Sequence, residues 1–216
     1  MLNTPEAKEI FKSCNRFLTH DYPKAPRQIL SELVETIDPD LEADRYGQGE
    51  LITSFEKEVA GLLGKEAAVF MPSGTMCQQI ALRIWQRRHG GNLFHLYPYV
   101  LSAQKGLRER LGRMESYHAK AKEIAALLSS FSEITIVPNP LHTNMMHLFL
   151  QGERAKLEAA TLEIARETGI WLFSWLASTQ LPPFTMFELT VGEATLDLSK
   201  QEIVAAFQSL LTRASA

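Results

Sequence analysis

The amino-acid sequence predicts a mixed protein of the α/β to α+β class, and two features of its pattern support this. Over the first 130 residues, apolar side chains recur mainly at helical spacing, and a single short apolar segment, Ala67 to Met71, predicts a strand. From residue 131 onward, strand and helix candidates follow one another in the order ββαββα. Such an order predicts a small α+β domain with a core of its own.

The helices of the first half are placed by apolar stripes and helix-breaking residues. Residues 1–20 predict a short helix, and residues 27–36 predict a second one that an Asp-Pro pair ends. Thr53-x-x-Glu56 has the capping-box pattern and predicts the start of a third helix. Gly64 is placed to end that helix, as a glycine after a helix C-terminus does.

The following segments connect this half to the last third of the chain. Pro72-Ser73-Gly74-Thr75 turns the predicted strand directly into another helix. A long helix is expected from Tyr99 to Ser129, with His118 on its apolar stripe as a hydrogen-bonded core histidine.

The last third predicts four strands and two helices. The strands are expected at residues 134–137, 144–150, 169–174 and 184–191. A helix over residues 153–168 separates the second strand from the third. Asp197-Leu-Ser199-Lys-Gln-Glu202 contains a capping box that starts the last helix, which buries Ile203, Phe207 and Leu210. The chain thus divides into residues 1–92, a long connecting helix within residues 93–130, and residues 131–216.

Composition excludes several classes of protein. Apolar residues make up 45% and charged residues 22% of the 216 residues, which are globular values. With a formal net charge of −3, the chain lacks the basic character of nucleic-acid or anionic-membrane binding. No apolar run is long enough to span a bilayer, and the N-terminus is too charged for a signal peptide. Two cysteines, Cys14 and Cys77, predict neither a disulfide framework nor a thiolate site, so a cytoplasmic location is expected.

The spacing of the histidines does not indicate a metal site. His142 and His147 are five residues apart, on or beside one predicted strand, and therefore face opposite sides. His89 and His95 flank a loop. Neither pair has the convergent geometry of a metal-binding cluster, so no metal ligand is predicted.

The turn Ser73-Gly74-Thr75 is the first place where the chemistry of the residues predicts a ligand. A helix N-terminus presents unpaired N–H groups and a partial positive charge, which favour a phosphate. The glycine allows close approach, and the two hydroxyl groups add donors. The alternative is that the turn only caps its helix, because Ser, Gly and Thr are common at such positions.

The surroundings of this turn carry a family resemblance. Asp44-Arg-Tyr46-Gly47-Gln-Gly49, then Phe55-Glu56-x-x-Val59-Ala60-x-Leu62-Leu63-Gly64-Lys65-Glu66-Ala67-Ala68, then Phe70-x-Pro72-Ser73-Gly74-Thr75-Met76 resemble the N-terminal region of the threonine aldolase and β-eliminating lyase family. The family consists of pyridoxal-phosphate enzymes with the aspartate-aminotransferase fold. The resemblance implies that Ser73, Gly74 and Thr75 bind the cofactor phosphate.

The C-terminal part resembles the same family from about His89 onward. The matching segments are Gly90-Gly91-Asn92, Tyr117-His118-Ala119, Thr143-Asn144-Met145-Met146 and Asp197-Leu-Ser199. The resemblance implies a remnant of the large domain, a connecting helix and a small α+β domain. In the family, about one domain's worth of chain lies between the two pieces. Here the sequence behaves as though joined across an internal deletion near Trp85.

In the family, the segment between these two pieces carries residues that are needed for catalysis. The resemblance implies a lysine that forms a Schiff base and an aspartate on the pyridine nitrogen, but no aspartate occurs between Asp44 and Asp197. Lys105 precedes a Gly-Leu pair, as the family lysine does, yet it lies within the predicted long helix and is expected to be an ordinary exposed lysine. The strand around Phe187 also lacks the arginine expected for the substrate carboxylate. No catalytic residue is therefore predicted.

Three functional expectations follow. By resemblance, the chain is a lyase-like protein of amino-acid metabolism that acts on β-hydroxy-α-amino acids with pyridoxal phosphate, and it is impaired in catalysis as it stands. The second expectation is a non-catalytic partner or regulatory subunit of a full-length homologue. The third is a truncated product without function. Because the central sheet would be mostly missing, exposed apolar residues are expected to drive self-association or pairing with a homologue.

Overall fold

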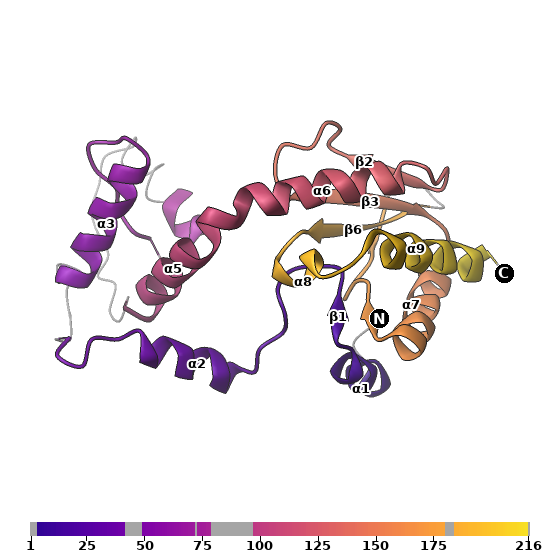
Figure 1. Cartoon of the computed structure of the whole chain (residues 1–216), viewed down its shortest axis with the longest axis horizontal. Helices are drawn as coiled ribbons and strands as arrows, with labels where there is room; N and C mark the ends of the chain where they lie inside the picture. The colour runs from indigo at the N-terminus through magenta and orange to yellow at the C-terminus, as the bar shows by residue number, and fades with distance from the viewer. Residues whose placement is uncertain (1–3, 42–48, 72, 79–96, 180–183, 216) are drawn as a thin grey trace. The chain divides into compact units, whose positions relative to one another are not determined.

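The computed structural model describes residues 4–41, 49–71, 73–78, 97–179 and 184–215 (Figure 1). These residues form two compact units. Unit 1 consists of Met1–Pro23 and Arg113–Ala216, and unit 2 consists of Lys24–Gly112. This division differs from the three predicted regions, because the first 23 residues group with the C-terminal part of the chain.

A four-stranded antiparallel sheet forms the centre of unit 1. Its strands lie in the order β2 (Ile134–Val137), β3 (Met145–Gln151), β6 (Phe184–Thr190) and β5 (Ala177–Ser178). The two long strands pair along their whole length, with Leu148 opposite Phe187. Because side chains alternate between the faces of a strand, every second residue of β3 and β6 is buried. Three predicted strands are confirmed here to within about a residue at most of their ends.

The predicted strand over residues 169–174 is corrected by the structure. Only β4 (Ile170–Trp171) has strand pairing, and it pairs in parallel with β1 (Arg16–Phe17) outside the main sheet. The predicted helix over residues 1–20 is correspondingly shorter, since α1 is Pro5–Ser13. Two-residue strands have no recognisable alternation, so the sequence pattern did not reveal this pair.

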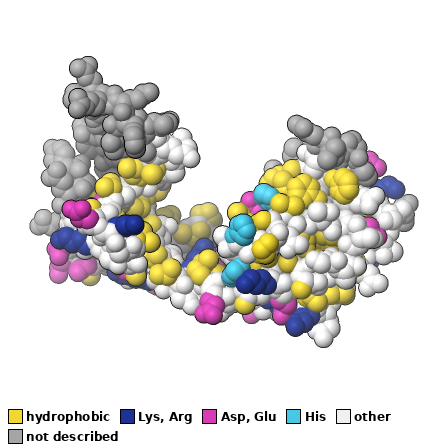
Figure 2. Space-filling view, turned by 90° about the horizontal axis from the view of Figure 1, so that it is seen from above, with side chains coloured by type: hydrophobic (Ala, Val, Ile, Leu, Met, Phe, Trp, Pro, Cys, Tyr) yellow, Lys and Arg dark blue, Asp and Glu magenta, His cyan; other side chains and the backbone are white. Residues whose placement is uncertain are grey.

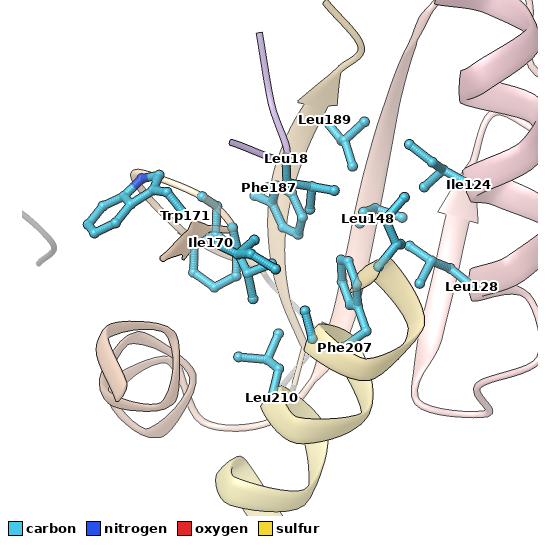
Figure 3. Close-up of a cluster of buried hydrophobic side chains, with 14 of the residues drawn as sticks. Leu18, Ile124, Leu128, Leu148, Ile170, Trp171, Phe187, Leu189, Phe207 and Leu210 are labelled. Carbon is cyan, nitrogen blue, oxygen red and sulfur yellow. The ribbon is translucent and has the colours of Figure 1, made fainter. Parts of the chain in front are cut away.

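Helices pack against the sheet and complete the core of unit 1. They are α6 (Met114–Leu128), α7 (Arg154–Thr168), the short α8 (Glu193–Leu196) and α9 (Lys200–Ser215). Figure 3 shows side chains from α6, α9 and the two long strands pointing toward one another. At the centre, Phe187, Leu148 and Phe207 are at most 1% exposed. The burial predicted for the last helix at Ile203, Phe207 and Leu210 is confirmed.

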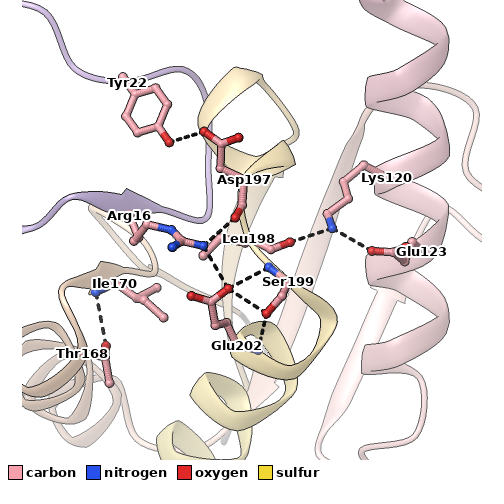
Figure 4. A network of polar contacts seen from close by, with 10 residues as sticks. All are labelled: Arg16, Tyr22, Lys120, Glu123, Thr168, Ile170, Asp197, Leu198, Ser199 and Glu202. Atoms are coloured by element: carbon pink, nitrogen blue, oxygen red, sulfur yellow. Dashed lines mark hydrogen bonds and ion pairs between the residues drawn. The ribbon is translucent and has the colours of Figure 1, made fainter.

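Polar contacts fix the start of α9 and the N-terminal segment (Figure 4). The Glu202 carboxylate accepts hydrogen bonds from the Ser199 backbone N–H at 2.8 Å and from the Ser199 hydroxyl at 2.7 Å. In return, the Glu202 N–H donates to Ser199 Oγ at 3.2 Å, which confirms the predicted capping box. Arg16 donates to Glu202 at 2.9 Å, and Tyr22 donates to Asp197. The first residues of the chain are thereby attached to its last helix.

The described residues of unit 2 form three helices and a short helical segment. They are α2 (Pro26–Glu35), α3 (Glu50–Leu62), residues 74–78 and α5 (Tyr97–Arg110). Its core is small, and its fully buried residues cluster around Ile52, Phe55 and Val100. The capping box predicted at Thr53 and Glu56 is wrong, because α3 already begins at Glu50 and Thr53 donates to the Gly49 carbonyl within the helix. Gly64 follows α3 with a φ of +59°, as predicted for a glycine after a helix end.

The predicted strand from Ala67 to Met71, called the extended segment here after that prediction, is wrong: these residues form neither a helix nor a strand and pair with no other described strand. The Phe70 N–H instead donates to the Glu56 carboxylate of α3 at 2.8 Å. The Phe70 ring packs on Phe55, with ring centroids 6.0 Å apart. A strand needs a partner strand, and no other described segment of unit 2 provides one.

The predicted long helix is divided. A 3₁₀ turn over Leu111–Arg113 separates α5, at the end of unit 2, from α6, in unit 1. Leu111 and Met114, at this junction, are 50% and 40% exposed, so the apolar stripe expected along one long helix is not buried over its whole length. None of the described helices combines the length and the apolar character that crossing a membrane would need.

Candidate functional site

The candidate site is the turn Ser73-Gly74-Thr75, which follows the extended segment and opens the helical residues 74–78. Ser73 Oγ accepts a hydrogen bond from the Met76 N–H at 3.2 Å, and the Ser73 carbonyl accepts one from the Cys77 N–H at 3.0 Å. Ser73 therefore caps its helix, the role that the sequence left as an alternative. Capping leaves other parts of the turn accessible to a ligand. Thr75 is exposed, and no heavy atom lies within 4 Å of the position that a Cβ on Gly74 would take.

A cavity of about 440 Å³ lies beside this turn within unit 2. Its lining is contributed by α3, the extended segment, the turn and α5. The lining residues are Phe55, Glu56, Val59, Ala68, Val69, Phe70, Met71, Ser73, Gly74, Cys77, Ala103 and Leu107. Most of these side chains are apolar, and the cavity therefore suits an apolar or aromatic group with one polar end at the turn.

Glu56 is the only charged residue among those lining the cavity. One of its carboxylate oxygens accepts the hydrogen bond of the Phe70 N–H, which anchors the extended segment to α3. A phosphate bound at the turn would share the cavity with this negative charge and would find no lysine or arginine in the described lining. The electrostatics of the cavity thus oppose a dianionic ligand.

Lys105 lies on α5 but does not reach the cavity. Ala103 and Leu107, two residues before and after it, both line the cavity. Because a helix turns by about 100° per residue, Lys105 points to the opposite side of α5. There its ammonium group contacts Glu109 at 2.7 Å and Glu32 of α2 at 3.6 Å.

These contacts have an electrostatic consequence. The hydrogen bond to Glu109, followed by the charge of Glu32, raises the pKa of Lys105 above its ordinary value. A nucleophilic lysine needs the opposite shift. The prediction that Lys105 is an ordinary helix lysine is supported, with the correction that its side chain is only 24% exposed.

The remaining sequence candidates lie apart from this cavity, in unit 1. His118 is half-buried, and its Nε2 lies 3.4 Å from the Leu141 carbonyl, in agreement with the predicted hydrogen-bonded histidine. His147 pairs with Glu188 at 3.5 Å, and His142 is exposed. Cys14 is buried, which raises the pKa of its thiol. The described part of the chain contains no cluster of His, Cys, Asp or Glu suited to hold a metal ion. His89 and His95 lie outside the described residues.

Sequence reasoning missed two residues of the cavity. It assigned Glu56 to a helix cap, whereas the structure uses its carboxylate to hold the extended segment. It gave Cys77 no role in a site, whereas the residue is exposed and lines the cavity. The spacing of Cys77 one turn after the serine was the available signal, since residues at i and i+4 share a helix face.

Comparisons with known proteins find similarity to the same family that the residue patterns resemble. Residues 37–123 match the family model of the β-eliminating lyases. Among solved structures, a candidate L-allo-threonine aldolase from Listeria monocytogenes is similar, with 21% identity, a TM-score of 0.82, and coverage of 95% of this chain and 98% of that one. A candidate aromatic amino acid β-eliminating lyase/threonine aldolase from an Exiguobacterium species has 18% identity, a TM-score of 0.81, and coverage of 96% and 99%. A search of curated proteins found no significant match.

These families depend on pyridoxal phosphate, and the described residues of the cavity do not provide the groups that this cofactor needs. The turn offers hydroxyl and backbone groups, but the described lining has no lysine for a covalent link and no cation for the phosphate. Glu56 is occupied by the Phe70 N–H. The described residues therefore do not fit the cofactor in a catalytic arrangement.

Two findings bear on the family resemblance: the matched segment and the fold. The matched residues include α3, the extended segment and the candidate turn, and they continue into α6. The structural likeness, at identities of 21% and 18%, shows the fold and extends over both units. The resemblance predicted from the residues is thus supported over residues 37–123 by the family model, and the chain has the fold of the two solved structures.

Proposed function

We propose that this chain is a threonine aldolase-like protein of amino-acid metabolism that does not catalyse carbon–carbon cleavage on its own. The observation that carries the proposal is the orientation of Lys105. It lies on the side of α5 opposite the cavity and is held there by Glu109 and Glu32. No other lysine comes from the elements that line the cavity next to the turn, except Lys57 of α3 and the exposed Lys65 that follows it.

The position of Lys57 on α3 argues against its use as a substitute. Glu56 and Val59 of the same helix line the cavity, whereas Lys57 is exposed and does not line it. Pyridoxal phosphate supplies an electron sink for a carbanion at the α-carbon of an amino acid, and the protein must hold and tune it. Because the chain has no aspartate between Asp44 and Asp197, the tuning partner that the family resemblance implies is missing too.

The turn retains a narrower role in this proposal. The hydroxyl groups of Ser73 and Thr75, together with the open backbone at Gly74, would contact the phosphate of a bound cofactor. Ser73 already accepts the Met76 N–H, so it has donor capacity left in its own O–H group. The Glu56 charge in the same cavity would weaken that binding. We therefore expect loose, reversible cofactor binding.

The segment between the two family-like pieces is part of the proposal. We infer an internal deletion near Trp85, which lies outside the described residues, because both flanks resemble the family and the catalytic residues between them are missing. The exposed apolar residues of unit 2 agree with this. Val69 of the extended segment is 72% exposed, and Leu63 at the end of α3 is 65% exposed.

A second candidate function is a non-catalytic partner, either of another copy or of a full-length homologue. The observation that favours it is the same exposure of apolar side chains in unit 2, since such surfaces mark sites of association. In this case the chain would act on amino-acid metabolism through the enzyme that it binds. The truncated, non-functional product remains as the alternative if neither catalysis nor association occurs.

Activity measurements test the proposal. Purified chain is incubated with threonine or allo-threonine and pyridoxal phosphate, and acetaldehyde and glycine are followed against free cofactor at the same concentration. We expect no turnover above the free-cofactor background. Turnover that disappears in Lys105→Ala and persists in the matched variant Lys156→Ala, an exposed lysine of unit 1, would overturn the proposal.

A further inference from the structure

One face of helix α2 carries apolar residues that nothing described in unit 2 covers. Glu32 lies on the opposite side of the helix, where it contacts Lys24 at 2.8 Å and Lys105 of α5 at 3.6 Å. At about 100° per residue, the positions two before and two after Glu32 lie almost opposite it on the helix. These positions are Leu30 and Val34, which are 61% and 65% exposed.

This face has a regular arrangement of charge as well as of apolar groups. It forms a shallow groove lined by Arg27, Leu30, Ser31, Val34 and Glu35. Arg27 is at the N-terminal end of the groove and Glu35 at its C-terminal end. Both are exposed, and neither forms an ion pair with another described residue. The small Ser31 lies between the two charges, where a second helix can approach closely.

We propose that the Leu30–Val34 face of α2 is a docking surface for the same face of a second copy of this chain. In an antiparallel pair with its two-fold axis near Ser31, each Arg27 lies opposite the partner's Glu35. The pair thus forms two equivalent Arg–Glu contacts around an apolar centre. A parallel pair would place like charges together at both ends, so charge complementarity selects the antiparallel arrangement.

The size of the surface sets the expected strength of binding. Two ten-residue helices bury less than the roughly 1,200 Å² that stable protein interfaces reach. We therefore expect reversible self-association with a micromolar dissociation constant. This inference deepens the self-association part of the proposed function, and it does not depend on whether the chain is catalytically active.

The experiment is sedimentation velocity of the full chain over a series of micromolar concentrations, with two charge-reversal variants. In a dimer of the Arg27→Glu variant, each of the two contacts places two glutamates opposite each other. In a dimer of the Glu35→Arg variant, each contact places two arginines opposite each other. We expect each variant to self-associate about tenfold more weakly than the natural chain, because surface ion pairs contribute modestly to binding. An equimolar mixture of the two variants restores both contacts, and we expect it to associate like the natural chain.

Further variants separate this surface from others and from misfolding. Leu30→Ser with Val34→Ser should abolish association, whereas Leu62→Ser, an exposed leucine of α3, should leave it unchanged. Helical circular dichroism reports whether each variant is folded, and rescue in the mixture shows that both charge variants are. A natural chain that stays monomeric, or association unaffected by the charge and apolar variants, would overturn the proposal. So would binding of this face to an intact homologue without self-association.

Discussion

Unit 1 and unit 2 differ in how completely their elements cover one another. In unit 1, the side chains of Phe173, Phe187 and Phe207 are at most 1% exposed, and both long strands have partners on each side. In unit 2, α2 has no fully buried residue, and the extended segment has no described strand beside it. Figure 2 shows hydrophobic side chains reaching the surface over the described part of unit 2, at the left of the view. The comparison teaches that the candidate turn and most of the segment matched by the family model lie in the unit whose described elements cover one another less completely.

The candidate turn belongs to the less complete of the two units. Its hydroxyl and backbone groups remain, because a helix start needs only a few neighbouring residues. A lysine and a carboxylate that converge on a ring need several strands to hold them, and such strands are not among the described residues of unit 2. A phosphate-binding turn therefore depends on fewer residues than a catalytic centre does.

The largest effect is expected from the core of unit 1. Phe207→Ala removes a fully buried ring between α9 and the sheet, and we expect it to lower the free energy of unfolding by about 3–5 kcal/mol. Urea denaturation followed by circular dichroism measures the change. Gln208→Ala, an exposed neighbour on the same helix, should change it little. Equal effects of the two variants would mean that unit 1 lacks the packing described.

Unit 2 should respond separately. Phe55→Ala removes the ring that packs on Phe70 in the small core of unit 2. We expect it to expose the backbone of α3 and α5 to hydrogen exchange while the amides of β3 and β6 keep their protection. Mass spectrometry of peptides after exchange locates the change. If β3 and β6 lost protection together with α3, the two units would unfold as one, and the comparison would fail.

The capping box of α9 should contribute less. Ser199→Ala removes the serine that caps the helix, and we expect a loss of about 1 kcal/mol at neutral pH in urea denaturation. Ser215→Ala, at the other end of the same helix, is the matched control. A loss no larger than that of the control would show that the cap does not stabilise α9.

The pH dependence of the same cap follows from Glu202. Hydrogen bonds from the Ser199 N–H and hydroxyl, with the charge of Arg16, lower the pKa of this carboxyl below 4.5 in the folded state. Its stabilising contribution is thus complete above the ordinary pKa and is lost as the pH falls through the lowered value. We expect the natural chain and Glu202→Gln to differ in stability at pH 7 and to become more similar as the pH falls through the lowered pKa of Glu202. A stability difference between the two chains that grew as the pH fell would contradict the lowered pKa of Glu202.

The smallest effect concerns Lys105. Its contacts with Glu109 and Glu32 are close to the surface, and surface ion pairs contribute little to stability. We expect Lys105→Met to leave the thermal unfolding midpoint nearly unchanged. A large decrease would show that α5 depends on these contacts and that Lys105 holds α2 in place.

Local patterns in the sequence predicted much of unit 1. Alternating side chains located β2, β3 and β6, and the Ser199–Glu202 spacing located the start of α9. The pairing of β1 with β4 was not predicted, because two-residue strands that are distant in sequence leave no recognisable pattern. In unit 2, the apolar segment Ala67 to Met71 predicted a strand, but strand formation depends on partners that a local pattern does not supply.

The candidate site could be predicted in part. Ser73-Gly74-Thr75 was found from its chemistry and its resemblance, and the absence of aspartate was visible in the sequence alone. The contact between Glu56 and the Phe70 N–H joins residues 14 positions apart through a turn, which spacing does not specify. The direction of Lys105 relative to the cavity became clear only from its neighbours Ala103 and Leu107.

The most direct test of the central claim is borohydride reduction of the chain after incubation with pyridoxal phosphate. Reduction fixes any covalent link between a lysine and the cofactor, and peptide mass spectrometry locates it. We predict that Lys105 is labelled no more than Lys156, an exposed lysine remote from the cavity in sequence. Stoichiometric labelling of Lys105, or of any other single lysine, accompanied by an absorbance band that threonine shifts, would contradict the claim that the catalytic centre is missing.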